Sequence, residues 1–333
     1  MTTLVSPLRR PRSSVFGSRA RTLLMLRRLL PALTFFLVLG VTVWLNPRVA
    51  SYNGFTLMLG LTVPIMLATL AQMFIITIGD FDFSIGAFVS FVACVGATML
   101  TDRPLLAITF LACGIFAYAA AAVVIELRRL PSIVVTLGLS FVWSGVAVLL
   151  LPSPGGRAPD WLHGLMTLRP PLVPLPFVIA VLCGLVLHWF LMRSSFGVLL
   201  RGAGGSRMAL TRARWSILGI RVVLYALAGL FGVLAGLSLL GLATSADANM
   251  ASRYTLLSVA GVILGGGEFT GGRVSPIGAV FGALTLGLTA TLLTFMRISP
   301  DWQIGAQGIV LIMVLALRVA INTLGRRSDG ESR

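Results

Sequence analysis

The sequence predicts an all-α fold, a polytopic bundle of about ten (8–10) transmembrane helices with two related halves and both termini in the cytoplasm. Of 333 residues, 57% are hydrophobic and 11% are charged, and the mean hydropathy is +0.98. A soluble domain carries roughly 25% charged residues, because its surface faces water. Here the apolar residues form continuous runs, many of them about the 20 residues that one membrane-crossing helix needs.

The predicted elements are a tail, ten apolar segments and a second tail. Residues 1–28 hold seven arginines and no acidic residue, which is typical of a cytoplasmic N-terminal tail. Residues 29–322 form the transmembrane domain, and residues 323–333 form a cytoplasmic C-terminal tail. We place the spans near 29–46, 55–77, 83–101, 105–127, 133–151, 172–192, 218–242, 254–266, 274–296 and 304–322. The eighth segment is short and bounded by glycines, so it is either a full span or a broken, re-entrant helix.

The distribution of arginine predicts the orientation. With the N-terminus inside, twenty arginines fall in cytoplasmic segments and six in outer loops, which supports both termini inside. The chain has no lysine, and its net charge of +16 follows the loops rather than one groove or stripe. We therefore expect contact with membrane lipid and exclude nucleic acid as a partner. The three cysteines and two histidines are scattered, so we propose no metal site.

Two stretches of the chain echo each other. Ile78-Gly-Asp-Phe-Asp-Phe-Ser-Ile-Gly86 matches Leu264-Gly-Gly-Gly-Glu-Phe-Thr-Gly-Gly272 with an offset of 186 residues. Both place an acidic residue, a phenylalanine and a hydroxyl between glycines, ahead of an apolar helix. Transporters are commonly built from two such halves around a central path. The predicted spans make the halves parallel, and the loss of one crossing would make them inverted, so the sequence leaves both relations open.

The polar residues of these echoes are the candidate site. Carboxylates beside apolar helices are expensive in a bilayer, which points to a water-lined path or a gate. Capping of the next helix is the alternative, with Asp82 or Ser84 accepting its free N–H groups. Both roles are compatible. The candidate residues of the path or gate are Asp80, Asp82, Ser84, Glu268 and Thr270.

The second echo does not form a standard nucleotide site. A phosphate-binding loop reads G-x-x-x-x-G-K-[ST], where the lysine reaches the phosphates and the hydroxyl binds magnesium. In the stretch from Gly267 the lysine position holds Arg273 and the hydroxyl position holds Val274. We expect no cofactor on this chain, and no nucleophile–base pair indicates an enzyme.

Residues 193–217 form the largest predicted inner loop. Within it, Ser206 is a candidate N-cap for a short helix that runs toward Trp215. One interpretation is a positively charged linker that follows the membrane surface. The other is a coupling helix that docks into a groove of a cytosolic motor subunit.

Four stretches resemble one known family. Gly79-Asp-Phe-Asp-Phe-Ser-Ile-Gly86 is similar to its G-G-[IF]-D-L-S-V-G signature, and Pro131-Ser-Ile-Val-Val-Thr-Leu-Gly138 to its P-[PA]-F-I-V-T-L-G stretch. Leu264 to Gly278 resembles L-G-G-x-x-[LF]-x-G-G-x-G-[ST]-x-x-G, and Ser195-Phe-Gly197 with Gly204-Gly205 resembles the start of the cytoplasmic loop. The family is the ribose/xylose/galactose-type (monosaccharide) ABC transporter permeases, in the superfamily of branched-chain amino-acid permeases. The resemblance extends over residues 30 to 320.

The resemblance implies partners and a mechanism. It implies a permease in the bacterial inner membrane with a second, identical or related permease copy, a cytosolic ABC ATPase that binds the ATP, and a periplasmic sugar-binding protein. The cargo would be a monosaccharide or related polyol. The residues implied in ATPase coupling are Phe196, Gly197, Gly204, Gly205, Ser206, Ala209 and Arg212. Two departures stand out: Asp80 replaces the family's second glycine, and the stretch from Met208 to Trp215 lacks the acidic residue and glycine of the usual loop.

Other functions remain open at this point. A proton-coupled secondary transporter would use Asp80, Asp82 and Glu268 as proton carriers. The superfamily also admits a branched-chain amino-acid or nucleoside permease. A membrane scaffold that transports nothing is the third alternative.

Overall fold

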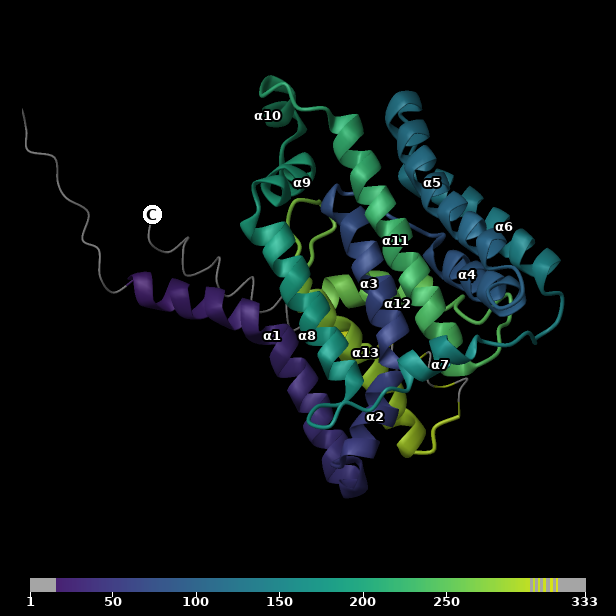
Figure 1. Cartoon of the computed structure of the whole chain (residues 1–333). Coiled ribbons are helices and arrows are strands. Elements are labelled where there is room, and N and C mark those ends of the chain that lie inside the picture. Colours follow the sequence, from purple (N-terminus) through teal and green to yellow (C-terminus); the bar gives the residue numbers. More distant parts are fainter. Residues whose placement is uncertain are drawn as a thin grey trace, which may run out of the picture.

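The protein is a bundle of helices (Figure 1), seen in a computed structural model that describes residues 16–299 and positions 302, 305, 308, 309, 312, 313 and 316, with side chains from residue 29 onward. No strand occurs among these residues. The first elements are α1 (Phe16–Leu45), η1 (Pro47–Val49), α2 (Tyr52–Gly60), α3 (Thr62–Thr77), α4 (Ile85–Met99), α5 (Pro104–Arg128) and α6 (Ser132–Leu150). They are followed by α7 (Asp160–Met166), α8 (Leu175–His188), η2 (Trp189–Arg193), α9 (Ser195–Gly205), α10 (Arg207–Arg212), α11 (Ile217–Ala243), α12 (Tyr254–Leu264) and α13 (Pro276–Phe295). The all-α prediction is confirmed.

Several helices are long and apolar enough to cross a membrane. Within the described part of the chain there are five: α5, α6, α8 continued by η2, α11 and α13. The pair α2 and α3 adds a sixth if it counts as one span. Residues 29–45, α4 and α12 are apolar but shorter. The chain is therefore a multi-pass membrane protein.

Two predicted segments depart from simple spans for local reasons. The segment 55–77 is divided between α2 and α3, which meet at a bend of 45°. Pro64 has no N–H to donate to the carbonyl of Gly60, so the helix breaks there. The segment 254–266 forms α12, whose 11 residues reach about 17 Å at 1.5 Å per residue. That is roughly half the thickness of the hydrocarbon layer.

Other predictions fall partly or wholly outside the described residues. The segment 304–322 is described only at isolated positions, and the C-terminal tail 323–333 is not described. Helix α1 begins at Phe16, inside the predicted N-terminal tail. The loop 193–217 contains two helices, α9 and α10, where one was expected.

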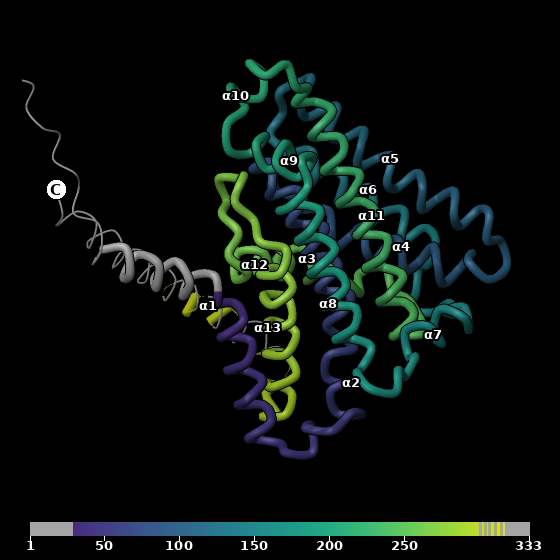
Figure 2. The backbone as a smooth tube through the Cα atoms, turned by 60° about the vertical axis from the view of Figure 1, so that its left-hand side comes forward, coloured from purple at the N-terminus to yellow at the C-terminus, as the bar shows by residue number. Residues whose placement is uncertain are grey.

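Helix α3 is the centre of the bundle. All of its residues are buried, and it packs against α11, α12 and α13. Figures 1 and 2 show α3 and α11 side by side, with α9 and α10 together at one end of the bundle. By contrast, α5, α6 and α8 expose large apolar side chains such as Phe116, Phe141 and Leu182. Those faces suit lipid or another apolar surface.

Two glycine pairs bring helices close together within the chain. Gly232 lies against Phe88, and Gly236 lies against Val92, so α11 fits closely on α4. Gly278 and Gly282 contact the backbone of α12 at Gly265 and Gly261. Small residues at helix crossings let backbones approach in this way. Both glycine pairs therefore serve packing inside the chain.

Candidate functional site

The candidate site is built around the first turn, residues 78–84, between α3 and α4. Asp80 is buried, and its carboxylate is paired with Arg221 near the start of α11, with 3.2 Å between Arg221 Nε and Asp80 Oδ2. The Tyr225 hydroxyl, one helical turn further on, donates to Asp80 Oδ2 at 3.0 Å. A buried charge is tolerable when an opposite charge and hydrogen bonds compensate it. The turn is thereby fixed to α11.

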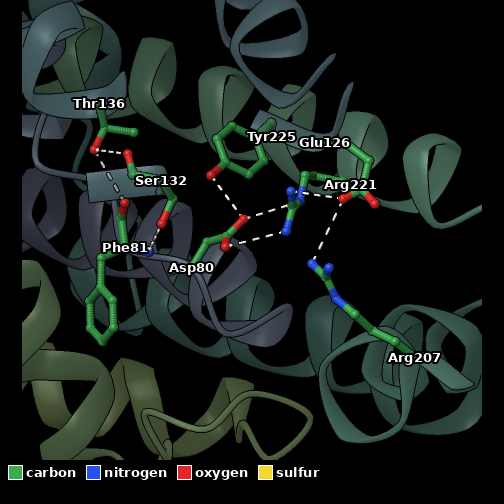
Figure 3. A network of polar contacts seen from close by, with 8 residues as sticks. All are labelled: Asp80, Phe81, Glu126, Ser132, Thr136, Arg207, Arg221 and Tyr225. Carbon is green, nitrogen blue, oxygen red and sulfur yellow. Dashed lines mark hydrogen bonds and ion pairs between the residues drawn. The ribbon is translucent and has the colours of Figure 1, made fainter. Parts of the chain in front are cut away.

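This ion pair continues to the exposed helix α10. Arg221 Nη1 lies 2.8 Å from Glu126 Oε2 on α5, and the same oxygen lies 3.8 Å from Arg207 Nη2 on α10. Figure 3 shows the row of charges from Asp80 through Arg221 and Glu126 to Arg207. We call these four residues the charge row. It joins the buried turn to the short helix that was predicted to couple to a motor subunit.

Asp82 occupies a different environment, with 1% of its surface exposed. Its carboxylate accepts hydrogen bonds from the Ser84 N–H at 2.7 Å, the Ser84 hydroxyl at 2.6 Å and the Tyr118 hydroxyl at 2.7 Å. With its amide oxygen facing the Asp82 N–H, Gln72 also pairs with the backbone of Asp82 at 3.2 Å in both directions. Asp82 thus connects α3, α5 and the start of α4.

The capping prediction holds in modified form. Ser84 is the N-cap residue of α4, yet its side chain makes no cap hydrogen bond. The carboxylate of Asp82, two residues earlier, accepts the Ser84 N–H instead. Charged acceptors near a helix N-terminus are stabilising because of the helix dipole.

Helix α6 holds the other side of the first turn. Ser132 Oγ accepts the Phe81 N–H at 3.2 Å, and Thr136 Oγ1 accepts the Phe83 N–H at 3.1 Å. The Thr136 hydroxyl lies 3.2 Å from the Phe81 carbonyl and 2.9 Å from the Ser132 carbonyl, to either of which it can donate. Hydroxyls four residues apart lie on one face of a helix. The first turn therefore has partners on α3, α5, α6 and α11.

The second turn, residues 265–275 between α12 and α13, is more open. Glu268 and Thr270 lie there, and Thr270 is exposed. The Glu268 carboxylate lies 3.5 Å from Arg273 Nη1, with side chains that are 41% and 78% exposed. Exposed ion pairs contribute little to stability, about 0–1 kcal/mol.

The two turns nevertheless touch. The rings of Phe81 and Phe269 have centroids 5.4 Å apart. The Gly272 N–H donates to the Thr77 carbonyl at 2.8 Å, across the end of α3. The two echoing stretches, far apart in the sequence, thus meet at one end of the bundle.

Helix α9 packs against the place where the two turns meet. A Cβ on Gly204 would collide with the Thr77 carbonyl and with the Gly272 nitrogen, so only glycine fits there without movement. A Cβ on Gly205 would meet nothing within 4 Å. We call the contact of Gly204 with Thr77, Gly271 and Gly272 the glycine junction. Through it the predicted coupling segment contacts the second turn and the end of α3 that leads into the first turn.

Apart from the buried Gly197, the other predicted coupling residues lie on the exposed side of α9 and α10. Ser194 caps α9 by accepting the Gly197 N–H at 2.9 Å, and Gly197 is buried against Leu191. Ser206 caps α10 as predicted, accepting the Ala209 N–H at 3.4 Å. Exposed residues of the set are Phe196, Gly205, Ser206, Ala209 and Arg212.

Comparison with known proteins places the chain in a family. Residues 54–315 match the family described as the permease component of branched-chain amino acid transport systems. The chain belongs to this permease family. It is a transport subunit, as the resemblance implied.

Named relatives cover most of the chain. It is 25% identical over 311 residues to the ribose import permease protein RbsC of Escherichia coli K12, covering 91% of this chain and 97% of the relative. It is 27% identical over 264 residues to the galactofuranose transporter permease protein YtfT of the same strain, covering 77% and 76%. It is 26% identical over 308 residues to the autoinducer 2 import system permease protein LsrC of Enterobacter sp. 638, covering 89% and 88%. No solved structure matches the chain.

Sequence reasoning missed several residues that complete the site. Arg221 was counted among the loop arginines, whereas it is buried in α11, and Glu126 and Tyr225 were not considered. The contacts of α6 with the first turn were missed as well. The sequence offered a signal for them, because hydroxyls recur every fourth residue at Ser132, Thr136, Ser140 and Ser144.

Proposed function

We propose that this chain is the membrane-spanning subunit of an ATP-binding-cassette importer that translocates a monosaccharide or related polyol. In this proposal it resides in the bacterial inner membrane and crosses it about ten times, with both termini in the cytoplasm. A periplasmic binding protein delivers the cargo, and a second permease copy completes the path. The named relatives are permease proteins of ribose import, galactofuranose transport and autoinducer 2 import.

The glycine junction carries the mechanistic part of the proposal. The exposed pair α9 and α10 is the surface offered to an ATPase, and Gly204 contacts the backbone near both turns. The charge row adds a second connection, from Arg207 on α10 to Asp80. A movement of α9 and α10 would therefore reach both turns at once, as a two-state transport cycle requires.

The roles of the polar residues follow from their positions. Asp80, Asp82 and Ser84 would hold the first turn in shape beside the path, and Glu268 and Thr270 would be the solvent-accessible part of a gate. Asp80 is engaged by Arg221, and Asp82 by three hydrogen bonds, which favours structural roles over proton transfer.

Reconstitution with partners tests the proposal. The permease is expected to co-purify with an ABC ATPase from its host, and proteoliposomes with that ATPase and the binding protein should accumulate sugar in the presence of ATP. Vanadate should abolish the uptake and an uncoupler should leave it unchanged. Accumulation by the permease alone, driven by a pH gradient, would show a proton-coupled transporter instead.

A further inference from the structure

A polar groove lies between α4, α6 and the segment 248–255 that leads into α12. Its volume is about 180 Å³. Phe83 and Ala87 form its apolar part. The polar side chains that line it are Ser90, Ser140, Ser144, Asn249, Ser252 and Thr255. Hydroxyls and one amide are present, and no ionisable side chain lines the groove.

Three of these side chains build the walls. Ser90 Oγ accepts the Ala251 N–H at 3.0 Å, and Thr255 Oγ1 accepts the Gly86 N–H at 3.2 Å. Ser140 donates to the Leu137 carbonyl of its own helix at 2.7 Å. The first two bonds fix the segment 248–255 against α4, so the groove has a defined shape.

The other three are unused by the protein. Among the described residues, the side chains of Ser144, Asn249 and Ser252 have no hydrogen-bonding partner. Polar groups in a membrane domain are costly unless something hydrogen-bonds to them. They come from two different elements, α6 and the segment 248–255, and line the same groove. Water or a solute that enters the groove can supply their partners.

The groove is continuous with the first turn. Ser132, Thr136, Ser140 and Ser144 form one ridge of α6 with a spacing of four residues. The first two hold the backbone of Phe81 and Phe83, and the last two line the groove. Phe83 belongs both to the first turn and to the lining of the groove. A shift of the first turn would therefore change the shape of the groove.

We propose that this groove is a binding site for the hydroxyl groups of a neutral sugar or polyol in transit, with Ser144, Asn249 and Ser252 as its hydrogen-bonding residues. The inference rests on the proposed function and deepens it. Hydroxyl and amide groups both donate and accept, which matches the hydroxyls of a carbohydrate. An amino acid would bring a carboxylate and an ammonium group, for which the groove offers no opposite charge.

Accessibility of the groove is the first test. In the reconstituted complex with Cys94, Cys113 and Cys183 replaced by serine, Ser144→Cys is expected to react with a membrane-impermeant methanethiosulfonate reagent. The matched control is Val142→Cys, two residues away on the exposed apolar face of α6, which should not react. Labelling of Ser144→Cys should be lost in the presence of whichever of D-ribose, D-galactose or myo-inositol the unsubstituted complex imports.

Uptake is the second test. Ser144→Ala and Asn249→Ala should each lower the rate of ATP-driven uptake at saturating sugar about two- to ten-fold, the range expected for one hydrogen bond. Ser252→Ala lies on the segment 248–255, as Asn249→Ala does, and should lower the rate of uptake by a similar factor. Val142→Ala should leave the rate unchanged, and co-purification of the ATPase with each variant shows that the complex is assembled.

The outcomes separate the inference from the function. ATP-driven uptake that persists at full rate in all three alanine variants, with Ser144→Cys unlabelled, overturns the groove and leaves the importer intact. If no imported sugar reduces the labelling of Ser144→Cys, the proposed binding site in the groove is also overturned. If the unsubstituted complex imports none of the three probes with ATP, the proposed function fails and the inference fails with it.

Discussion

The two turns that echo each other in the sequence are stabilised in opposite ways. The first turn takes its partners from elsewhere: Gln72 on α3, Tyr118 on α5, Thr136 on α6 and Arg221 on α11. The second turn is largely self-contained. Its Glu268 N–H donates to the Arg273 carbonyl, its Gly271 N–H donates to the Glu268 carbonyl, and its ion pair spans five residues.

This difference shows that matching residues do not imply matching roles. The matched acidic residue can be buried and held by the hydroxyls of Ser84 and Tyr118, as Asp82 is, or half exposed beside a near neighbour, as Glu268 is. The first turn is a fixed part of the core, and the second is attached to it mainly through Thr77, Phe81 and Gly204. The second turn is therefore the one that can move at lower cost.

Arg221→Met should give the largest effect. It leaves the buried Asp80 carboxylate without its counter-ion, which costs about 3–5 kcal/mol in comparable buried pairs. We expect a clear loss of thermal stability of the purified permease in detergent. The double variant Asp80→Asn with Arg221→Met removes both charges and should recover much of the loss. Equal stability of Arg221→Met and the unsubstituted protein would contradict a fixed first turn.

Gly204→Ala tests the junction between the turns. The added Cβ collides with backbone at Thr77 and Gly272, and overpacking of this kind costs about 1–3 kcal/mol. Gly205→Ala is the matched control, because a Cβ at that position meets no atom within 4 Å. We expect a lower midpoint of thermal unfolding for the first variant and little change for the second. Similar behaviour of the two would mean that α9 is not held against the turns.

Thr136→Val removes the hydroxyl that holds the first turn from α6. The Phe83 N–H then loses its acceptor, and an unsatisfied buried donor costs on the order of 1–2 kcal/mol. Thr136→Ser keeps the hydroxyl and should stay close to the unsubstituted protein in the same unfolding measurement. A loss as large in the serine variant would show that the methyl group, and not the hydrogen bond, matters there.

Glu268→Gln should have the smallest effect on stability. Its ion pair with Arg273 is exposed to water, so we expect a change of about 0–1 kcal/mol. The measurement is again the unfolding midpoint, now at low and at moderate salt. Destabilisation as large as that of Arg221→Met would erase the contrast between the two turns.

The sequence predicted those features that depend on nearby residues. Helical membrane spans follow from long apolar runs, and the cap at Ser206 follows from a residue type at a helix start. The glycine pairs of α11 and α13 are equally local signals, because small residues four apart form one flat face of a helix.

Features that depend on distant partners could not be predicted. Arg221 already falls at the start of the predicted span 218–242, but its burial depends on Asp80 and Glu126 from two other elements, which the sequence does not place beside it. The echo matches Asp82 with Glu268, but the surrounding helices decide which turn is covered. Helix α9 was missed, because its glycine-rich end resembles a loop.

The absence of side-chain atoms at Gly204 has a consequence for how a displacement of α9 spreads through the protein. Backbone in direct contact with backbone cannot be compressed, so α9 cannot approach one turn while leaving the other in place. A displacement of α9 toward the turns would therefore be passed on to both of them, and the less firmly held second turn would move further.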